Sequence, residues 1–115
     1  AELDGQPVTV HGDARLLRRM VRNLLENARR HGAPPIELRV SSTGRAAELR
    51  VCDHGIGVPE HEREKVFEPF YRRAGASEGA GLGLALVRQI ARRHGGEARC
   101  SGNCFSVTLS PQIAA

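Results

Sequence analysis

Three short segments, rich in glycine or in polar side chains, interrupt a chain that otherwise reads as amphipathic helices and apolar strands. One lies inside a helical segment (23–27), one follows a strand (53–57), and one precedes a second helix (79–84). Around them the predicted elements run short strand, long helix, two strands, short helix, long helix, two strands. Two strand pairs grouped with two long helices predict one sheet covered on one face, which is a two-layer α+β sandwich.

The first helix is predicted over residues 14–31, because apolar residues recur there at helical spacing. Asp13 precedes it as a candidate N-cap, Gly32 ends it, and Pro34 with Pro35 prevents its continuation. The side chains expected on its buried face are Leu17, Val21, Leu24, Leu25 and Ala28.

Turn residues divide the rest of the chain into shorter elements. Apolar alternation predicts strands, and apolar residues at helical spacing predict a second buried helix. The strands are expected at 8–10, 36–42, 47–53, 97–101 and 105–109, and the helices at 60–66 and 82–94. The buried stripe of the last helix is expected to be Leu86, Val87, Ile90 and Ala91.

The chain has 115 residues, enough for a single domain over 1–115 with one modest core. No apolar run approaches the roughly 20 residues of a membrane span, so no membrane contact is expected. Since the chain begins with Ala1 rather than Met, we expect a fragment of a longer protein. The net charge is +4, but the arginines are spread along helix faces without interleaved aromatic residues, so nucleic acid is not an expected partner.

The three cysteines, Cys52, Cys100 and Cys104, are too few and too unevenly spaced for a disulfide framework. We therefore expect small thiol side chains on strands, in a reducing cytoplasm. Cys100 and Cys104 are four residues apart, but no further pair completes a matching zinc pattern.

A polar face runs along the first helix beside its apolar stripe. Asn23, Asn27 and Arg30 follow one another at i, i+4 and i+7, so they share this face. Such groups need polar partners, which a phosphate with its hydrated metal or hydrogen bonds to a loop could supply. Glu26, four residues after Arg22 and four before Arg30, is expected to form ion pairs along the helix surface.

Asp53 ends a predicted strand, and Gly55 and Gly57 follow it. A carboxylate at this place can accept a hydrogen bond from an exocyclic amine, and glycine lets the backbone pass close to a flat ring. By itself the pattern is typical of a turn.

Gly79, Gly81 and Gly83 lead into the last helix, and a glycine-rich turn before a helix N-terminus suits an anion. The segment matches neither the P-loop nor the dinucleotide-binding pattern.

In this order and at these distances, the three segments resemble the N box and two glycine boxes of the ATP-binding domain of bacterial sensor histidine kinases. The superfamily includes gyrase B, the ninety-kilodalton heat-shock chaperones and the mismatch-repair ATPases. The resemblance covers nearly the whole chain. It implies a Bergerat-type fold, with a mixed and mostly antiparallel sheet, about three helices on one face, and a mobile ATP lid at about 72–82.

The resemblance also implies roles for individual residues. Asn27 holds Mg²⁺ against the phosphates of ATP, with Asn23 as a second candidate ligand. Arg30 contacts phosphate and takes part in catalysis. His31 lies near the nucleotide, although Tyr is common at this position. Asp53 binds the adenine amino group.

The other implied ATP contacts come from the two glycine boxes and from a segment between them. The glycine boxes contribute Gly55, Ile56, Gly57, Gly79, Gly81, Leu82, Gly83 and Leu84. Residues 67–72 resemble the F box, where Arg72 would lie near the terminal phosphate as the second catalytic residue. Arg73 could share that work or be a solvated charge of the lid. Phe67 and Phe70 are interpreted as core anchors.

Two departures from the family pattern affect these roles. The lid is short, and Cys104 stands just before Phe105 where Thr is common. Gyrase-type enzymes carry a catalytic Glu at the first N-box position, where this chain has Asn23, and an amide cannot act as a general base. Transfer of the phosphoryl group is therefore favoured over hydrolysis.

The implied function is to bind Mg-ATP and present its γ-phosphate to a histidine on a separate dimerisation domain of the parent kinase. The response regulator would be an indirect partner. The domain would be cytoplasmic and monomeric, with a parent that could be anchored in the inner membrane. Two alternatives stay open at this point: an anti-sigma-factor-type serine kinase of the same superfamily, and a non-catalytic module that works by docking.

Overall fold

The computed structural model describes residues 2–5, 12–42, 46–71 and 83–110. Its centre is a five-stranded sheet in the order β1-β2-β3-β5-β4. β1 pairs with β2 in parallel, and every other neighbouring pair is antiparallel. The strands are β1 (Glu2–Gly5), β2 (Glu37–Ser42), β3 (Ala47–Cys52), β4 (Glu97–Ser101) and β5 (Cys104–Leu109).

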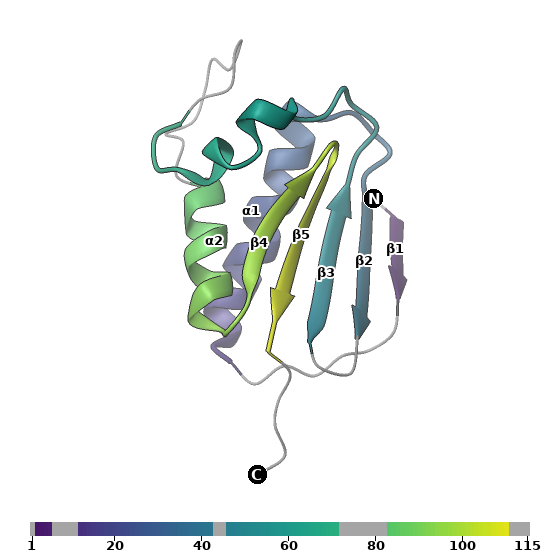
Figure 1. Cartoon of the computed structure of the whole chain (residues 1–115). Coiled ribbons are helices and arrows are strands. Elements are labelled where there is room, and N and C mark those ends of the chain that lie inside the picture. Colours follow the sequence, from purple (N-terminus) through teal and green to yellow (C-terminus); the bar gives the residue numbers. More distant parts are fainter. Residues whose placement is uncertain (1, 6–11, 43–45, 72–82, 111–115) are drawn as a thin grey trace.

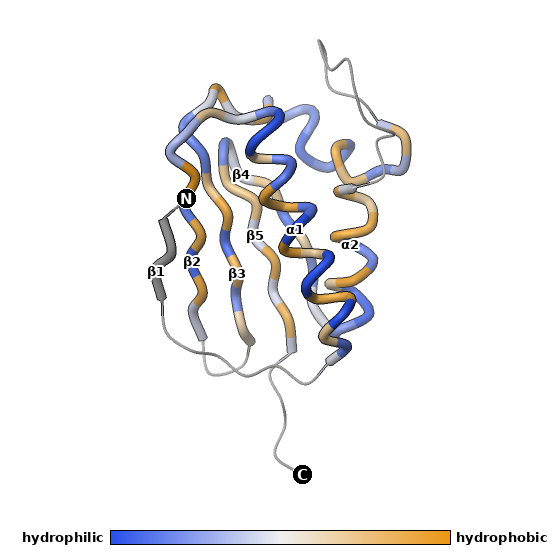
Figure 2. The backbone as a smooth tube through the Cα atoms, turned by 180° about the vertical axis from the view of Figure 1, so that it is seen from behind, coloured by the Kyte–Doolittle hydropathy of each residue, from blue (hydrophilic) through white to orange (hydrophobic). Residues whose placement is uncertain are grey.

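Two α-helices, α1 (Ala14–His31) and α2 (Gly83–Arg93), lie together on one face of the sheet (Figure 1). Figure 2 shows hydrophobic and hydrophilic residues alternating along both helices, and the buried ones include Leu24 of α1 and Val87 of α2. The two-layer α+β sandwich with a mixed, mostly antiparallel sheet is therefore confirmed.

α1 has the bounds that the sequence predicts. The Asp13 carboxylate accepts hydrogen bonds from the backbone N–H groups of Arg15 and Leu16, which α1 itself leaves without partners. At the other end, the Gly32 N–H donates to the Ala28 carbonyl at 2.9 Å. Both ends of the helix are thus set by local sequence.

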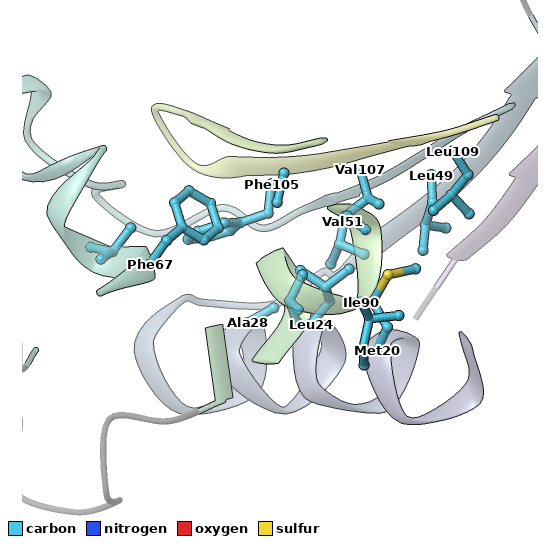
Figure 3. Close-up of a cluster of buried hydrophobic side chains, with 14 of the residues drawn as sticks. Met20, Leu24, Ala28, Leu49, Val51, Phe67, Ile90, Phe105, Val107 and Leu109 are labelled. Atoms are coloured by element: carbon cyan, nitrogen blue, oxygen red, sulfur yellow. The ribbon is translucent and has the colours of Figure 1, made fainter. Parts of the chain in front are cut away.

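The core lies between the helices and the inner face of the sheet (Figure 3). Leu24 and Met20 of α1 are each 1% exposed, and Val87 of α2 and Val107 of β5 are fully buried. At the end nearest the β4–β5 turn, the Phe67 and Phe105 rings meet edge to face, with their centroids 6.0 Å apart. An aliphatic interior closed by one aromatic pair agrees with a composition that is 3% aromatic.

Some predicted elements differ from those observed. Residues 60–66 were expected to form one helix, but two short 3₁₀ turns are found, Glu60–Glu62 and Lys65–Phe67. Only Val66 and Phe67 of this stretch are buried, so it has no continuous apolar stripe with which to dock an α-helix. The edge strand β1 was not predicted, and the strand expected at 8–10 lies outside the described residues.

The expectation of free thiols is wrong for two of the three cysteines. Cys52 and Cys104 form a disulfide, and Cys100 keeps its thiol group. The pairing follows from the sheet, since the β3–β5 register places Cys52 directly opposite Cys104. Their separation of 52 residues along the chain hides this neighbourhood in the sequence.

His94 connects the far ends of the two helices. Its Nε2 accepts from the Asp13 N–H at 3.0 Å, and its Nδ1 lies 2.8 Å from the Ile90 carbonyl. A neutral imidazole protonated at Nδ1 satisfies both contacts. The start of α1 and the end of α2 are thereby joined.

Among the described residues, no helix is both long and apolar enough to cross a membrane.

Truncating Leu24, a buried side chain of α1, should lower the stability of the fold. Leu24→Ala is expected to lower the free energy of unfolding by about 2–5 kcal/mol, because it removes buried methyl groups and leaves a cavity. Urea unfolding of both proteins measures the change. Arg22→Ala, on the exposed side of the same helix, should stay within about 0.5 kcal/mol of the wild type, and an equal loss in both variants would contradict this packing.

Glu97 should make folding sensitive to acid. The backbone N–H of Ala98 and the Arg92 guanidinium both donate to its carboxylate, and they hold the pKa of Glu97 below its ordinary value of 4.5. A lowered pKa gives stability that is fully present above pH 4.5 and is lost as the pH falls through the folded-state pKa.

Glu97→Gln should therefore lower the urea midpoint at neutral pH, and the difference from wild type should shrink at about pH 3. A difference that is constant with pH would contradict this role for the charge.

Candidate nucleotide site

Two segments singled out in the sequence, 23–27 and 53–57, and the described part of the third, Gly83 and Leu84, lie toward one end of the sandwich. The end of α1, the end of β3, the β4–β5 turn and the start of α2 all lie there (Figure 1). The Asn23 side-chain amide donates to the Gly83 carbonyl at 3.3 Å, which ties the polar face of α1 to the first residue of α2. The first and third segments are therefore joined directly.

Asp53 is the one charged residue that is buried among the described residues, at 8% exposure. Its Oδ1 accepts from the Gly55 N–H at 2.6 Å. The carboxylate has no further hydrogen-bond partner within the described ranges. A buried carboxylate can accept several hydrogen bonds, so this one keeps acceptor capacity for a donor brought by a ligand.

Glycine is needed where α1 meets this carboxylate. A Cβ on Gly32 would lie 2.2 Å from Asp53 Cγ, and one on Gly55 would lie 2.9 Å from Asp53 Oδ1 and 3.1 Å from Gly32 Cα. The end of α1 and the loop after β3 therefore close on Asp53 from two sides. Sequence analysis interpreted Gly32 only as a helix terminator, because a glycine after a helix carries no sign of a distant partner.

Residues 53–58, which we call the Asp53 loop, are held from both flanks. On one side, the His54 N–H donates to the Ala33 carbonyl at 2.8 Å. On the other side, the Val58 N–H donates to the Gly102 carbonyl at 2.8 Å, and Gly57, at φ 81°, lies against the same turn. The loop thus has a defined shape, with a fully exposed Ile56 at its tip.

Asn103, in the β4–β5 turn, is a site residue that sequence analysis missed. Its carbonyl accepts from the Asp53 N–H at 3.0 Å, and its side-chain amide donates to the Asp53 carbonyl. These two bonds fix the backbone that carries the buried carboxylate. A lone Asn between two predicted strands is typical of a turn, so no signal in the sequence distinguishes this role.

On the polar face of α1, some side chains form ion pairs and Asn27 has no hydrogen-bond partner among the described residues. Glu26 accepts from Arg29 Nη2 at 2.6 Å and from Arg30 Nε at 2.9 Å. The two arginines hold the pKa of Glu26 below its ordinary value, chiefly through the hydrogen bond from Arg29. The expected ion pair with Arg30 is therefore present. The Asn27 side chain, which follows Glu26 directly, has no hydrogen-bond partner in the described part of the chain.

Several proposed contact residues are only partly placed. His31 is exposed at the end of α1, and Leu84 is partly buried and packs against the core. A Cβ on Gly83 would meet nothing within 4 Å, so this glycine is not required by close packing. The predicted lid, with Arg72, Arg73, Gly79, Gly81 and Leu82, lies outside the described residues.

The interpretation of both phenylalanines as core anchors holds for one of them. Phe67 is 3% exposed, but Phe70 is 71% exposed and has a backbone φ of 66°. Phe70 therefore presents an aromatic ring to solvent. It immediately follows Pro69, which lines a cleft of about 440 Å³ together with Asn23, Gly83 and Leu86.

Comparison with known proteins decides the family. The model of the histidine kinase-, DNA gyrase B- and HSP90-like ATPase family matches residues 12–113. The chain belongs to this ATPase family.

It is 48% identical over 95 residues to the signal transduction histidine-protein kinase/phosphatase MprB of Mycobacterium sp. strain KMS, a match covering 78% of the chain and 18% of MprB. To the adaptive-response sensory kinase SasA of Rippkaea orientalis it is 37% identical over 111 residues, covering 88% of the chain and 28% of SasA.

Solved structures from the same ATPase family agree in fold. A structure of the mycobacterial sensor histidine kinase MprB superimposes with a TM-score of 0.81 at 34% identity, covering 98% of this chain and 82% of that one. The ATP-binding domain of PrrB from Mycobacterium tuberculosis gives a TM-score of 0.77 at 33% identity, covering 97% and 81%. The chain thus spans 18% of MprB and 28% of SasA, and 81% of the PrrB ATP-binding domain.

The contact between α1 and Asp53 can be tested without any ligand. Gly32→Ala should lower the free energy of unfolding by about 1–3 kcal/mol, because its Cβ would overlap the Asp53 carboxylate. In an Asp53→Ala background the same change should cost much less. A double-mutant cycle in urea measures the coupling, and additive effects would show that the two residues do not touch.

Proposed function

We propose that this domain binds Mg-ATP and presents the γ-phosphate to a histidine on a separate dimerisation domain of a sensor kinase. The observation that carries the proposal is the buried Asp53 carboxylate, enclosed by Gly32 and Gly55 and left with acceptor capacity. Membership of the ATPase family makes ATP the ligand to place there.

Asp53 would recognise the base. The exocyclic amine of adenine donates hydrogen bonds, whereas guanine has a carbonyl at the equivalent position and would place an acceptor against the carboxylate. A hydrogen bond to a charged group is worth about 1.5–3 kcal/mol. Gly55 and Gly57 leave room for a ring beside the backbone, because neither has a Cβ.

The phosphates would lie between α1 and the start of α2. The first N–H groups of a helix have no partners within it and favour anions, and the Asn23 bond to Gly83 places the start of α2 beside the polar face of α1. Asn27 offers an unengaged amide oxygen for Mg²⁺, which prefers oxygen ligands and keeps several of its waters. Arg30, from the Glu26 pair, and Arg72 would offset phosphate charge during transfer.

The chain supplies position and charge rather than a nucleophile of its own. Asn23, at the first position of the polar face, cannot act as a general base for hydrolysis, and its amide is bonded to Gly83. The exposed Phe70 ring, beside the cleft that contains Asn23, offers an apolar contact for an incoming acceptor helix. In the cytoplasm, the histidine of the acceptor domain would take the γ-phosphoryl group from the ATP that this domain holds. A response regulator would then receive the phosphoryl group from that histidine.

Nucleotide binding is the first test. Isothermal titration with Mg-ATP should give measurable heat for the wild type, and Asp53→Asn should weaken binding by at least about tenfold, since the amide places N–H groups against the adenine amine. Glu60→Gln, an exposed carboxylate outside the site, is the matched control and should bind like the wild type.

Mg-GTP should bind more weakly than Mg-ATP. If the wild type gave no heat with Mg-ATP, or if Asp53→Asn bound as tightly as the wild type, the proposal would be overturned.

Transfer is the second test. Incubation of this domain with the acceptor domain of its parent and radiolabelled ATP should yield a phosphoprotein whose label is lost in acid but survives alkali, as expected for phosphohistidine. Asn27→Ala should reduce labelling by at least about tenfold, since it removes a metal ligand. A label stable to acid would instead indicate a serine kinase.

A further inference from the structure

The disulfide is placed at the base of the candidate nucleotide site. Cys52 is the last residue of β3 and is followed by Asp53. Cys104 is the first residue of β5 and is preceded by Asn103. One covalent bond therefore joins the two chain segments that carry the buried carboxylate and its backbone partner.

The same two segments are joined next to the disulfide by hydrogen bonds alone. The Asp53 N–H donates to the Asn103 carbonyl, and the Asn103 side chain donates to the Asp53 carbonyl. Beyond them, the Gly102 carbonyl accepts from Val58 at the far end of the Asp53 loop. The Sγ–Sγ bond therefore restrains the frame in which this loop is held.

The disulfide is reachable from solvent. Both cysteines are partly exposed, and they line a cleft of about 290 Å³ with Arg39 and Arg50. Their neighbours Val51 and Phe105 face the core, so alternation along the strands puts the cysteines on the sheet face opposite the helices. Glu37 and Asp53 line the same cleft, so the disulfide lies in a polar pocket that a small thiol reagent can enter.

We propose that the Cys52–Cys104 pair is a redox-modification site that sets the affinity of the domain for nucleotide. When oxidised, the pair holds Asp53 in place before ATP arrives, so less conformational freedom is lost on binding. When reduced, β3 and β5 are joined at this end only by hydrogen bonds, and the affinity falls. The inference rests on the proposed function, because ATP is the ligand whose affinity changes.

The chemistry balances with a dithiol as the reductant. The dithiol gives two electrons to the Sγ–Sγ bond and becomes a disulfide itself. Its two thiol protons finish on the sulfurs of Cys52 and Cys104. Disulfides in reducing compartments are usually transient, catalytic or redox-sensing, which agrees with a reversible role in a domain that uses cytoplasmic ATP.

The test begins by counting thiols. The purified chain is divided into an oxidised sample and a sample reduced with dithiothreitol, and each is alkylated under denaturing conditions and weighed by mass spectrometry. The chain has three cysteines, so the oxidised sample should take up one label, on Cys100, and the reduced sample three. Three labels in both samples would overturn the inference.

Calorimetry with Mg-ATP then compares the two states. The reduced wild type should bind at least about threefold more weakly than the oxidised wild type. The Cys52→Ser/Cys104→Ser variant should bind like the reduced protein and ignore dithiothreitol, whereas Cys100→Ala should keep the full response.

The outcomes separate the two proposals. Equal affinity in the two redox states of the wild type would overturn the redox inference and leave nucleotide binding intact. Absence of binding in both states, with the disulfide confirmed by labelling, would overturn the proposed function and the inference with it.

Discussion

The contact between the end of α1 and the Asp53 carboxylate is the constraint on which the rest of the site depends. It requires glycine at position 32, since a Cβ there would lie 2.2 Å from the carboxylate carbon. The approach buries a charged group beside a helix end while one of its oxygens is satisfied by the next loop. The helix layer and the sheet thereby come into close contact outside the hydrophobic core.

α1 serves the core and the candidate site with different faces. Leu24 and Ala28 are buried against the sheet, while Asn23 and Asn27, one position earlier in each case, lie at the edge of that buried surface. Asn27 is five residues from Gly32, which corresponds to about 7.5 Å along the helix axis. Packing of the apolar stripe therefore sets both the height and the rotation of the amides relative to Asp53.

Local patterns were enough to predict most of the architecture. The N-cap at Asp13, the apolar stripe of α1 and the hairpin strands are encoded within a few residues of where they act, so their bounds were close to correct. Candidate residues on α1 and after β3 were identified through a family resemblance, and the structure places Asn23 against Gly83 and the end of α1 against Asp53. The roles of these residues toward ATP remain predictions.

What could not be predicted depends on partners that are distant in sequence. In the sequence, Gly32 indicates only the end of a helix and Asn103 only a turn. Their roles beside Asp53 become visible when the fold brings these residues together. The disulfide needs the β3–β5 register, which spacing alone does not reveal. Phe70 was interpreted as a core anchor, but the residue is 71% exposed and its backbone φ is 66°.

The His94 bridge makes the sandwich asymmetric. It pins the C-terminal end of α2 to the start of α1, while at the opposite end the Asn23 amide makes a single hydrogen bond to Gly83. α2 is 11 residues long, or about 16 Å, so a rotation of 10° about the His94 end would displace Gly83 by about 3 Å. A small rotation of α2 about the His94 end would therefore shift Gly83, the residue that Asn23 holds beside the candidate site, by more than the rest of the helix.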